Sequence, residues 1–160
     1  MDFSKITEDL FIGVMPGVVD YGHLRALGVR LVINMRFTRW PLHDPHQHPL
    51  DFVWLPSFDT MFIPIPIPML VHGARKALQT IENGGKVYSH CGQGRHRAVA
   101  MGASVLIAQG YAPQAAMELI KSQRAVADPD IFYIRRQILK FAREWHGKKD
   151  IRVRLPPYGG

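Results

Sequence analysis

Short hydrophobic runs alternate with longer segments of mixed polarity along most of this chain. Runs rich in Val, Ile and Leu that are bounded by polar or turn residues are typical of buried β-strands. They lie at residues 10–12, 31–35, 52–55 and 87–89, and a shorter run at 3–6 suits an edge strand. The pattern therefore predicts a sheet whose strands come from the first 90 or so residues of the chain.

Helical periodicity fills the segments between these strands and the whole of the C-terminal part. Gly28 and the run Asn83-Gly84-Gly85 are helix-ending signals, and Pro113 is a helix start. Asp128 as N-cap with Pro129 at the first helical position predicts another start. The predicted helices cover residues 21–27, 69–82, 98 to about 110, 113 to about 124, and 129 to about 145.

Strands that alternate with helices, followed by helices alone, indicate an α/β protein. We expect a single domain with a central mixed or parallel sheet of about four to five strands and helices on both faces. A length of 160 residues, 47% of them hydrophobic, suits one compact core. The domain is expected to span residues 1–150, and residues 151–160, which are basic and contain Pro and Gly, are expected to form a C-terminal tail.

Charge and cysteine content narrow the setting. Of the net charge of +7, residues 121–160 contribute +6, which indicates either an anionic partner or a solvated basic surface. The sequence lacks the combined aromatic and basic motif that would indicate nucleic-acid binding, so we do not expect a nucleic-acid partner. A single cysteine excludes an internal disulfide, and neither a signal peptide nor an apolar stretch of about 20 residues is present, so we expect a cytoplasmic protein without a transmembrane segment.

The segment from Lys86 to Arg97 contains the strongest chemical signal. A predicted strand delivers Cys91 into a glycine-rich turn, and the turn leads into an alanine-rich helix. Free amide groups at a helix start favour anions, so this setting favours the thiolate form of Cys91. This turn therefore combines a nucleophile, Cys91, with a site for an anion.

The same loop is suited to hold phosphate. Glycine lets the backbone approach a ligand closely, and a guanidinium can bind two phosphate oxygens at once. We therefore expect the phosphate to be bound by the guanidinium of Arg97 and by the loop residues Gly92, Gln93, Gly94, Arg95, His96 and Arg97. A Cys followed by Arg at this spacing is a weak signal alone, since 13 of the 160 residues are Arg.

The flanking residues strengthen this signal. The pattern His90-Cys91-x-x-Gly94-x-x-Arg97 resembles the signature of the cysteine-dependent protein tyrosine phosphatase superfamily. The segment Leu55-Pro56-Ser57-Phe58-Asp59-Thr60 looks like the general-acid loop of the small dual-specificity branch, and Asp59 precedes Cys91 by 32 residues, as is usual there. Further similarity lies in residues 10–13, 28–34 and the closing helices, so the resemblance spans nearly the whole chain.

This resemblance implies a mechanism. Cys91 would attack a phosphate monoester and form a phosphocysteine, Arg97 would hold the phosphate, and Asp59 would protonate the leaving oxygen. His90 would support the cysteine loop. No metal or organic cofactor is required. Asp51 and Asp44 are the fallback candidates for the acid.

The chain departs from the family pattern at one position. The family usually has Ser or Thr directly after the arginine, where its hydroxyl assists the departure of the thiolate, and this chain has Ala98. We expect slower breakdown of the phosphocysteine as a result.

The substrate stays open at this point. A phosphoprotein carrying phosphotyrosine and phosphoserine or phosphothreonine is favoured, an anionic phospholipid or inositol phosphate is the next candidate, and an RNA 5′-phosphate is the third. Arg95 and His96 would suit a highly anionic head group, and peripheral membrane contact is compatible with the sequence. The residues do not indicate an oligomeric state.

Other classes of function and other motifs were weighed against this interpretation. A phosphate-recognition module without catalysis is one alternative, although it would have no use for Cys91 and Asp59. A sulfur-transfer domain is another, and it leaves Asp59 without a role. His43, His46 and His48 near Asp44 do not have the spacing of a zinc site. The run of residues 61–68, in which Pro alternates with Ile, predicts either a hydrophobic lip for the substrate or packing against the core.

Overall fold

The computed structural model describes residues 1–154, and side chains through residue 148. Five strands form one sheet in the order β1-β2-β5-β3-β4, with β1 antiparallel to β2 and all other pairs parallel. The strands are β1 (Phe3–Lys5), β2 (Leu10–Val14), β3 (Val29–Arg36), β4 (Asp51–Ser57) and β5 (Lys86–Cys91). The predicted α/β architecture, with a mixed five-stranded sheet in a single domain, is confirmed.

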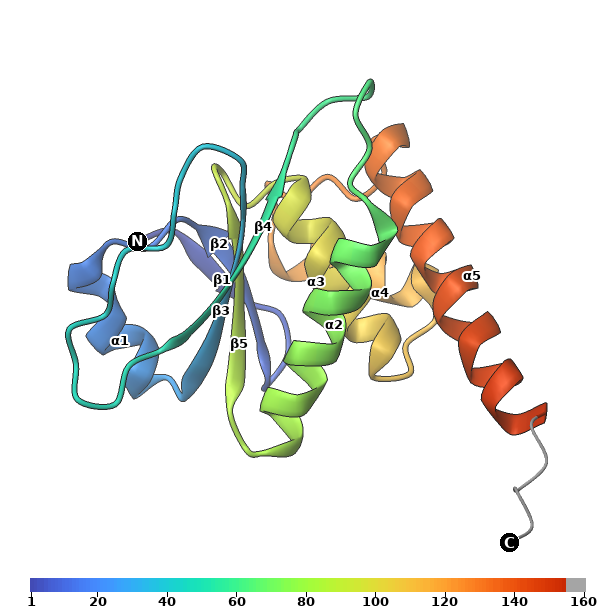
Figure 1. The fold of residues 1–160 in the computed structure, drawn as a ribbon. Coiled ribbons are helices and arrows are strands. Elements are labelled where there is room, and N and C mark those ends of the chain that lie inside the picture. Colours follow the sequence, from blue (N-terminus) through green and yellow to red (C-terminus); the bar gives the residue numbers. More distant parts are fainter. Residues whose placement is uncertain (155–160) are drawn as a thin grey trace, which may run out of the picture.

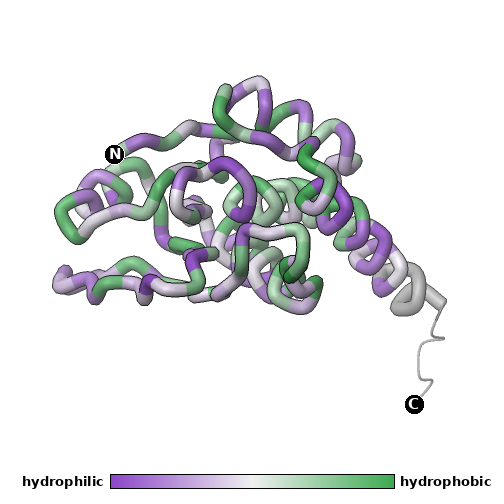
Figure 2. Tube along the Cα trace, turned by 90° about the horizontal axis from the view of Figure 1, so that it is seen from above, coloured by the Kyte–Doolittle hydropathy of each residue, from purple (hydrophilic) through white to green (hydrophobic). Residues whose placement is uncertain are grey.

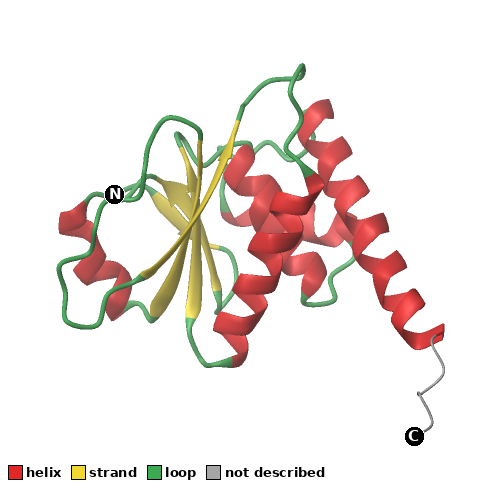
Figure 3. Cartoon of the chain, viewed as in Figure 1, coloured by secondary structure: helices red, strands yellow, loops and turns green. Residues whose placement is uncertain are grey.

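Helices cover both faces of the sheet, as predicted, but unequally (Figures 1 and 3). The short helix α1 lies on one face, and the other four pack together on the opposite face. The bounds are α1 (Tyr21–Ala26), α2 (Ile67–Glu82), α3 (Arg97–Ala108), α4 (Pro113–Gln123) and α5 (Phe132–Arg154). A 3-10 turn, η1 (Val18–Asp20), precedes α1.

Two hydrophobic clusters follow from these layers. The larger one joins one face of the sheet to the four-helix side, and residues 98–108 of α3 are buried throughout. The smaller one packs Tyr21 and Leu24 of α1 against Phe11, Val32 and Tyr88 on the other face. Because α3 is enclosed by apolar neighbours, its N-terminal end is held firmly at the point where β5 ends.

The last helix differs from its predicted range. It begins at Phe132, and the predicted start at Asp128 and Pro129 is wrong. Residues 129–131 form a turn instead, the Ile131 carbonyl accepts the first helical hydrogen bonds from the N–H groups of Ile134 and Arg135, and the Asp128 N–H donates to the carbonyl of Arg95. The helix also continues to Arg154, into the segment expected as a tail, and residues 155–160 lie outside the described residues.

The histidine-containing loop between β3 and β4 is organised by Asp44, which is buried. Its carboxylate accepts hydrogen bonds from the N–H groups of His46 and Leu50 and from the guanidinium of Arg25. Burial raises the pKa of Asp44, but these hydrogen bonds outweigh burial and leave the pKa below its ordinary value. His46 Nδ1 in turn accepts a hydrogen bond from the N–H of His48, so these groups serve the loop itself.

No helix among the described residues is long and apolar enough to cross a membrane.

Candidate active site

Cys91 is the last residue of β5, and its side chain is buried. β5 lies in the centre of the sheet between β2 and β3, so Cys91 is enclosed on both sides by parallel neighbours. Residues 92–96 form the turn that follows, and α3 begins at Arg97. The predicted strand, loop and helix are therefore present, at the carboxyl edge of a parallel sheet, where α/β folds place their sites.

The carbonyl groups of four of the turn residues, 93–96, accept hydrogen bonds from groups outside the turn. Those of Gln93 and Gly94 accept hydrogen bonds from Arg124, that of Arg95 from the N–H of Asp128, and that of His96 from the N–H of Ala100. A peptide plane whose carbonyl points outward turns the next N–H inward. Among the described residues, none accepts a hydrogen bond from the amides of residues 92–97, so these amides remain available to an anion.

Arg124, from the end of α4, has the central part in this arrangement. Its Nε and Nη2 lie 2.8 and 3.0 Å from the carbonyl oxygens of Gly94 and Gln93. The guanidinium also donates to both carboxylate oxygens of Asp2 and to the hydroxyl of Ser4. The Arg124 hydrogen bond lowers the pKa of Asp2. The buried guanidinium is thus satisfied entirely by the loop and by the N-terminal strand.

Gly94 is required by the backbone of the loop. Its φ of 62° lies in the left-handed region, and a Cβ at this position would come within 2.7 Å of the backbone of Gly13 in β2. Any larger residue would push the turn away from the sheet.

Arg97 is anchored to the ends of two strands. Its Nη1 donates to the carbonyls of Met35 in β3, at 3.1 Å, and Ser57 in β4, at 2.7 Å. The Ser57 hydroxyl also donates to the Met35 carbonyl. The Nε of Arg97 is buried and has no hydrogen-bond partner among the described residues. One side of the guanidinium is therefore fixed, and the other can bind an anion in the loop.

Asp59 lies beside the cysteine loop although it comes from the segment after β4. Both of its carboxylate oxygens are 3.1 Å from Nδ1 of His96, and Oδ2 is 3.9 Å from Nε of Arg97. The hydroxyl of Tyr133, on α5, donates to Oδ1 at 2.8 Å. Three segments that are distant in sequence thus meet at this carboxyl group.

Tyr133 keeps its proton over the physiological pH range. Burial, together with its hydrogen bond to Asp59 and the charge of that carboxylate, raises the pKa of Tyr133 to about 12. It therefore acts as a hydrogen-bond donor to Asp59. His96 is the second donor to Asp59: because the carboxylate accepts the hydrogen bond, Nδ1 of His96 donates it. The other ring nitrogen, Nε2, is buried and has no hydrogen-bond partner among the described residues, so it can bind another group.

His90 lies on β5 next to Cys91, and its side chain is buried. Burial lowers the pKa of His90 to about 4. A hydrogen bond with the Cys91 backbone raises this pKa by less than burial lowers it, and the charge of Arg36 lowers it a little further. The ring is therefore neutral at physiological pH. This setting suits the supporting role predicted for His90, and a role as a base is not needed.

The structure brings some of the predicted residues together and separates others. Cys91, Asp59, Arg97 and His96 share one site, whereas the Arg95 side chain is half-exposed and lies 3.9 Å from Asp128. The Gln93 side chain is also exposed, so for both residues the binding of phosphate stays a prediction.

Neither Asp44 nor Asp51, the fallback candidates, lies where it could act as the general acid. Asp44 is bound within its own loop. Asp51 is in register with Leu31, which pairs with Val87, so it lies toward the opposite edge of the sheet from Cys91. There it lines a groove of about 740 Å³ between β4 and α2.

The sequence interpretation missed Arg124 and Tyr133, and it assigned His96 a role toward phosphate alone. Arg124 was counted within a basic C-terminal region, and Tyr133 within a helix. No local pattern marks either residue, because each acts on a loop or an acid that is 30 or more residues away.

Comparison with solved structures confirms the predicted fold. Human DUSP28 aligns with a TM-score of 0.79 at 20% identity, over 90% of this chain and 95% of that chain. PTPMT1 in complex with PI(5)P aligns with a TM-score of 0.77 at 24% identity, over 94% and 98%. The human tyrosine phosphatase-like serine/threonine/tyrosine-interacting protein aligns with a TM-score of 0.74 at 17% identity, over 90% and 97%.

These likenesses establish that the chain has the fold of small dual-specificity phosphatases, as the sequence resemblance predicted. No protein-family model matches the sequence. A search of the curated proteins also gave no match.

The burial of His90 predicts how stability depends on pH. Its pKa is lower in the folded state than the ordinary value of 6.5, so the unfolded chain binds the proton more readily and stability is lost as pH falls below 6.5. From pH 7 to pH 5 we expect the free energy of unfolding to fall by about 2 kcal/mol. Urea denaturation at the two pH values measures this.

His90→Gln is the matched variant, because it keeps a polar side chain that cannot titrate. Its unfolding free energy should change much less between the two pH values. An equal slope in both proteins would show that another group carries the effect.

Proposed function

We propose that the protein is a phosphate monoester hydrolase that works through a phosphocysteine intermediate. The observation that best supports catalysis over simple phosphate binding is the position of Asp59. A carboxyl group from a separate segment is held against the cysteine loop by His96 and Tyr133, close to Arg97. A binding module for an anion would be weakened by such a group, whereas a hydrolase requires a proton donor there.

In the first step, the Cys91 thiolate attacks phosphorus, a sulfur–phosphorus bond forms, and the bond to the leaving oxygen breaks. Asp59 gives its proton to that oxygen. The amides of residues 92–97, which make no hydrogen bond among the described residues, and the free side of Arg97 stabilise the three equatorial oxygens as charge develops on them. Because these donors are fixed before the substrate arrives, little reorganisation is needed.

In the second step, water attacks the phosphocysteine. Asp59, now ionised, accepts the proton from water, and Cys91 leaves as a thiolate while orthophosphate is released. No residue is consumed, and no metal or organic cofactor takes part in the scheme. A reducing compartment such as the cytoplasm suits a mechanism that depends on one free thiol.

For the substrate we propose phosphoproteins, with activity on phosphotyrosine and on phosphoserine or phosphothreonine. The fold shared with DUSP28 supports this choice. A second candidate is a phosphoinositide or other anionic phospholipid, supported by the shared fold of PTPMT1, whose structure contains PI(5)P. The noncatalytic alternative has its counterpart in the fold neighbour described as a phosphatase-like interacting protein.

Orthophosphate release across a substrate panel tests this proposal. The panel contains an aryl phosphate, phosphotyrosine and phosphothreonine peptides, a phosphoinositide and a 5′-triphosphorylated RNA, each with a chelator present. We expect release from the aryl phosphate and the peptides, and loss of release in Cys91→Ser. The preferred substrate then assigns the branch.

Two outcomes would contradict the proposal. Activity that survives in Cys91→Ser would show a mechanism without the phosphocysteine. If nothing is released, but phosphopeptides still bind and Arg97→Ala prevents binding, the protein is a recognition module.

Asp59 and Tyr133 should matter most when the leaving group is poor, because proton donation then limits the first step. Asp59→Asn should slow hydrolysis of an alkyl phosphate by about a hundredfold or more and affect a good aryl leaving group much less. Tyr133→Phe removes one hydrogen bond that positions the carboxyl group. It should slow hydrolysis of the alkyl phosphate by about tenfold, again with a much smaller effect on the aryl phosphate. Ratios of kcat for the two substrates measure this selectivity.

Asp51→Asn and Tyr111→Phe are the matched controls, since Asp51 lies toward the opposite edge of the sheet and Tyr111 follows the far end of α3. Both should leave the ratio unchanged. An equal loss on the two substrates in Asp59→Asn would exclude Asp59 as the proton donor.

Ala98 should make breakdown of the intermediate slow. Its side chain is buried in the first turn of α3 and offers no hydroxyl to the departing thiolate. We expect a burst of product in stopped-flow assays and trapping of the phosphoenzyme. Ala98→Ser should speed the second step by about tenfold, the value of one hydrogen bond.

Ala108→Ser, at the other end of α3, is the control and should keep the burst unchanged. The expectation fails if no phosphoenzyme accumulates and Ala98→Ser leaves turnover as it was.

A further inference from the structure

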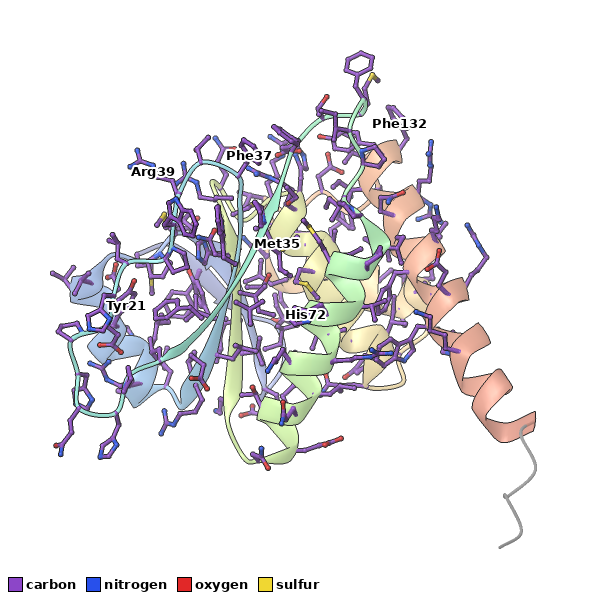
Figure 4. The ribbon with its side chains drawn as sticks, viewed as in Figure 1. Tyr21, Met35, Phe37, Arg39, His72 and Phe132 are labelled. Carbon is purple, nitrogen blue, oxygen red and sulfur yellow. The ribbon has the colours of Figure 1, made fainter. Side chains whose placement is uncertain are left out.

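The end of the molecule that carries the cysteine loop is surrounded by exposed apolar side chains. They come from three separate segments: the loop after β3, the segment between β4 and α2, and the start of α5. We refer to six of them as the apolar rim: Phe37, Trp40, Met61, Phe62, Ile63 and Phe132. Figure 4 shows Phe37 and Phe132 on this end of the fold, on either side of the ends of the strands.

Contacts tie the rim to the candidate site. The ring of Phe37 packs on Phe58 with centroids 4.2 Å apart, and Phe58 directly precedes Asp59. Phe132 lies against Tyr133, the residue that donates to Asp59. A surface that binds the rim would therefore present its own groups to the cysteine loop.

The run of residues 61–68 divides into a buried part and an exposed part. Ile65 and Ile67 are buried, and the Ile65 carbonyl accepts a hydrogen bond from Gln137 on α5. By contrast, Phe62 is 83% exposed, and its neighbours Met61 and Ile63 are half-exposed. Packing against the core is confirmed for the second half of this run, and the exposed first half is compatible with the predicted lip.

Cations accompany the apolar side chains. Arg39 is exposed, and Figure 4 shows it beside Phe37 on the same end of the molecule. Among the described residues, no carboxylate forms a salt bridge with Arg36 or Arg39, and the nearest one to the half-exposed Arg95 is 3.9 Å away. Within the two loop segments 36–42 and 58–66, the one acidic residue is Asp59. Figure 2, which looks down on this end, shows hydrophobic and hydrophilic stretches side by side.

From these features we propose that the rim docks the protein on the surface of an anionic phospholipid bilayer. This inference rests on the proposed function only in its consequence, that docking would bring the second candidate substrate, the phosphate of a membrane lipid, within reach of Cys91. A bilayer offers an apolar layer beneath a negatively charged surface, which matches protruding apolar tips flanked by arginines. A peptide partner would instead be expected to fill a groove, and the grooves beside β4, beneath the histidine loop and between α2 and α5 are not lined by rim residues.

The height of the β4–α2 segment supports this choice of occupant. It rises above the neighbouring loops in Figure 1, so its tip would meet a flat surface first. Phe62 contacts the rest of the chain so little that its ring is free to enter the acyl boundary. Arg39 and Arg36 would then lie near the lipid head groups.

Sedimentation with vesicles tests the inference. Phosphatidylglycerol is the suitable anionic lipid, because it carries a phosphate diester and no monoester, so its binding reports the rim and not turnover. We expect the protein to bind vesicles of phosphatidylcholine mixed with phosphatidylglycerol and to bind pure phosphatidylcholine vesicles weakly. Phe62→Ser should reduce binding by about tenfold or more, and Arg39→Gln by about fivefold.

Two variants on other surfaces serve as matched controls. Tyr111→Ser removes an exposed aromatic side chain beyond the far end of α3, and Arg143→Gln removes an exposed cation on α5. Both should bind the mixed vesicles as the unmodified protein does. Hydrolysis of a soluble aryl phosphate should be unchanged in Phe62→Ser.

The outcomes separate this inference from the proposed function. If the aryl phosphate is hydrolysed but vesicles are not bound, or are bound equally well by Phe62→Ser, the membrane inference is wrong and the hydrolase stands. In that case the rim faces a protein. If vesicles are bound through Phe62 and Arg39 but no substrate is hydrolysed, the docking surface stands and the catalytic proposal is wrong.

Discussion

The site depends above all on the direction in which the carbonyls of the cysteine loop point. Arg124 binds two of them from outside, and Asp128 and the first turn of α3 bind the next two. A buried guanidinium without these acceptors would be costly, and so would the carbonyls without their donor. Each therefore stabilises the other, and the inward amides follow from the same geometry. The donors thus bind the loop carbonyl oxygens, which would otherwise repel an anion at this site.

A second constraint comes from the parallel sheet. Arg97 is fixed by carbonyls at the ends of β3 and β4, while Cys91 ends the strand between β2 and β3. Because all of these strands end at the same edge, residues that are 40 and 62 positions apart in sequence come into contact. Asp59 lies two residues after the end of β4 and accepts a hydrogen bond from Tyr133 of α5. The chemistry thus requires the complete sheet and the last helix.

Much of this could be predicted, because the signals are local. The strand before Cys91, the glycines of the loop and the alanine-rich helix after it all lie within one short segment, and Gly94 meets a steric demand that only glycine satisfies. The start of α5 was misplaced because Asp128-Pro129 is a helix-start signal, whereas the structure has a turn there and the Asp128 N–H contacts the distant Arg95 carbonyl. Arg124 and Tyr133 could not be recognised either, because each acts through contacts with residues that are distant in the sequence. Asp44 looked like a spare acid because its binding to Arg25 and the 46–50 backbone cannot be seen in sequence.

The loops after β3 and β4 separate chemistry from recognition. At their bases they are held by hydrogen bonds, from Trp54 to the Arg36 carbonyl and from Ser57 to the Met35 carbonyl. Their tips make few polar contacts and expose aromatic and aliphatic side chains. Fixed bases preserve the geometry around Arg97 and Asp59, so the tips are free to carry residues that stability alone would not favour at a surface. An exposed Phe62 beside the candidate phosphate site is what the proposed docking on an apolar and anionic surface requires.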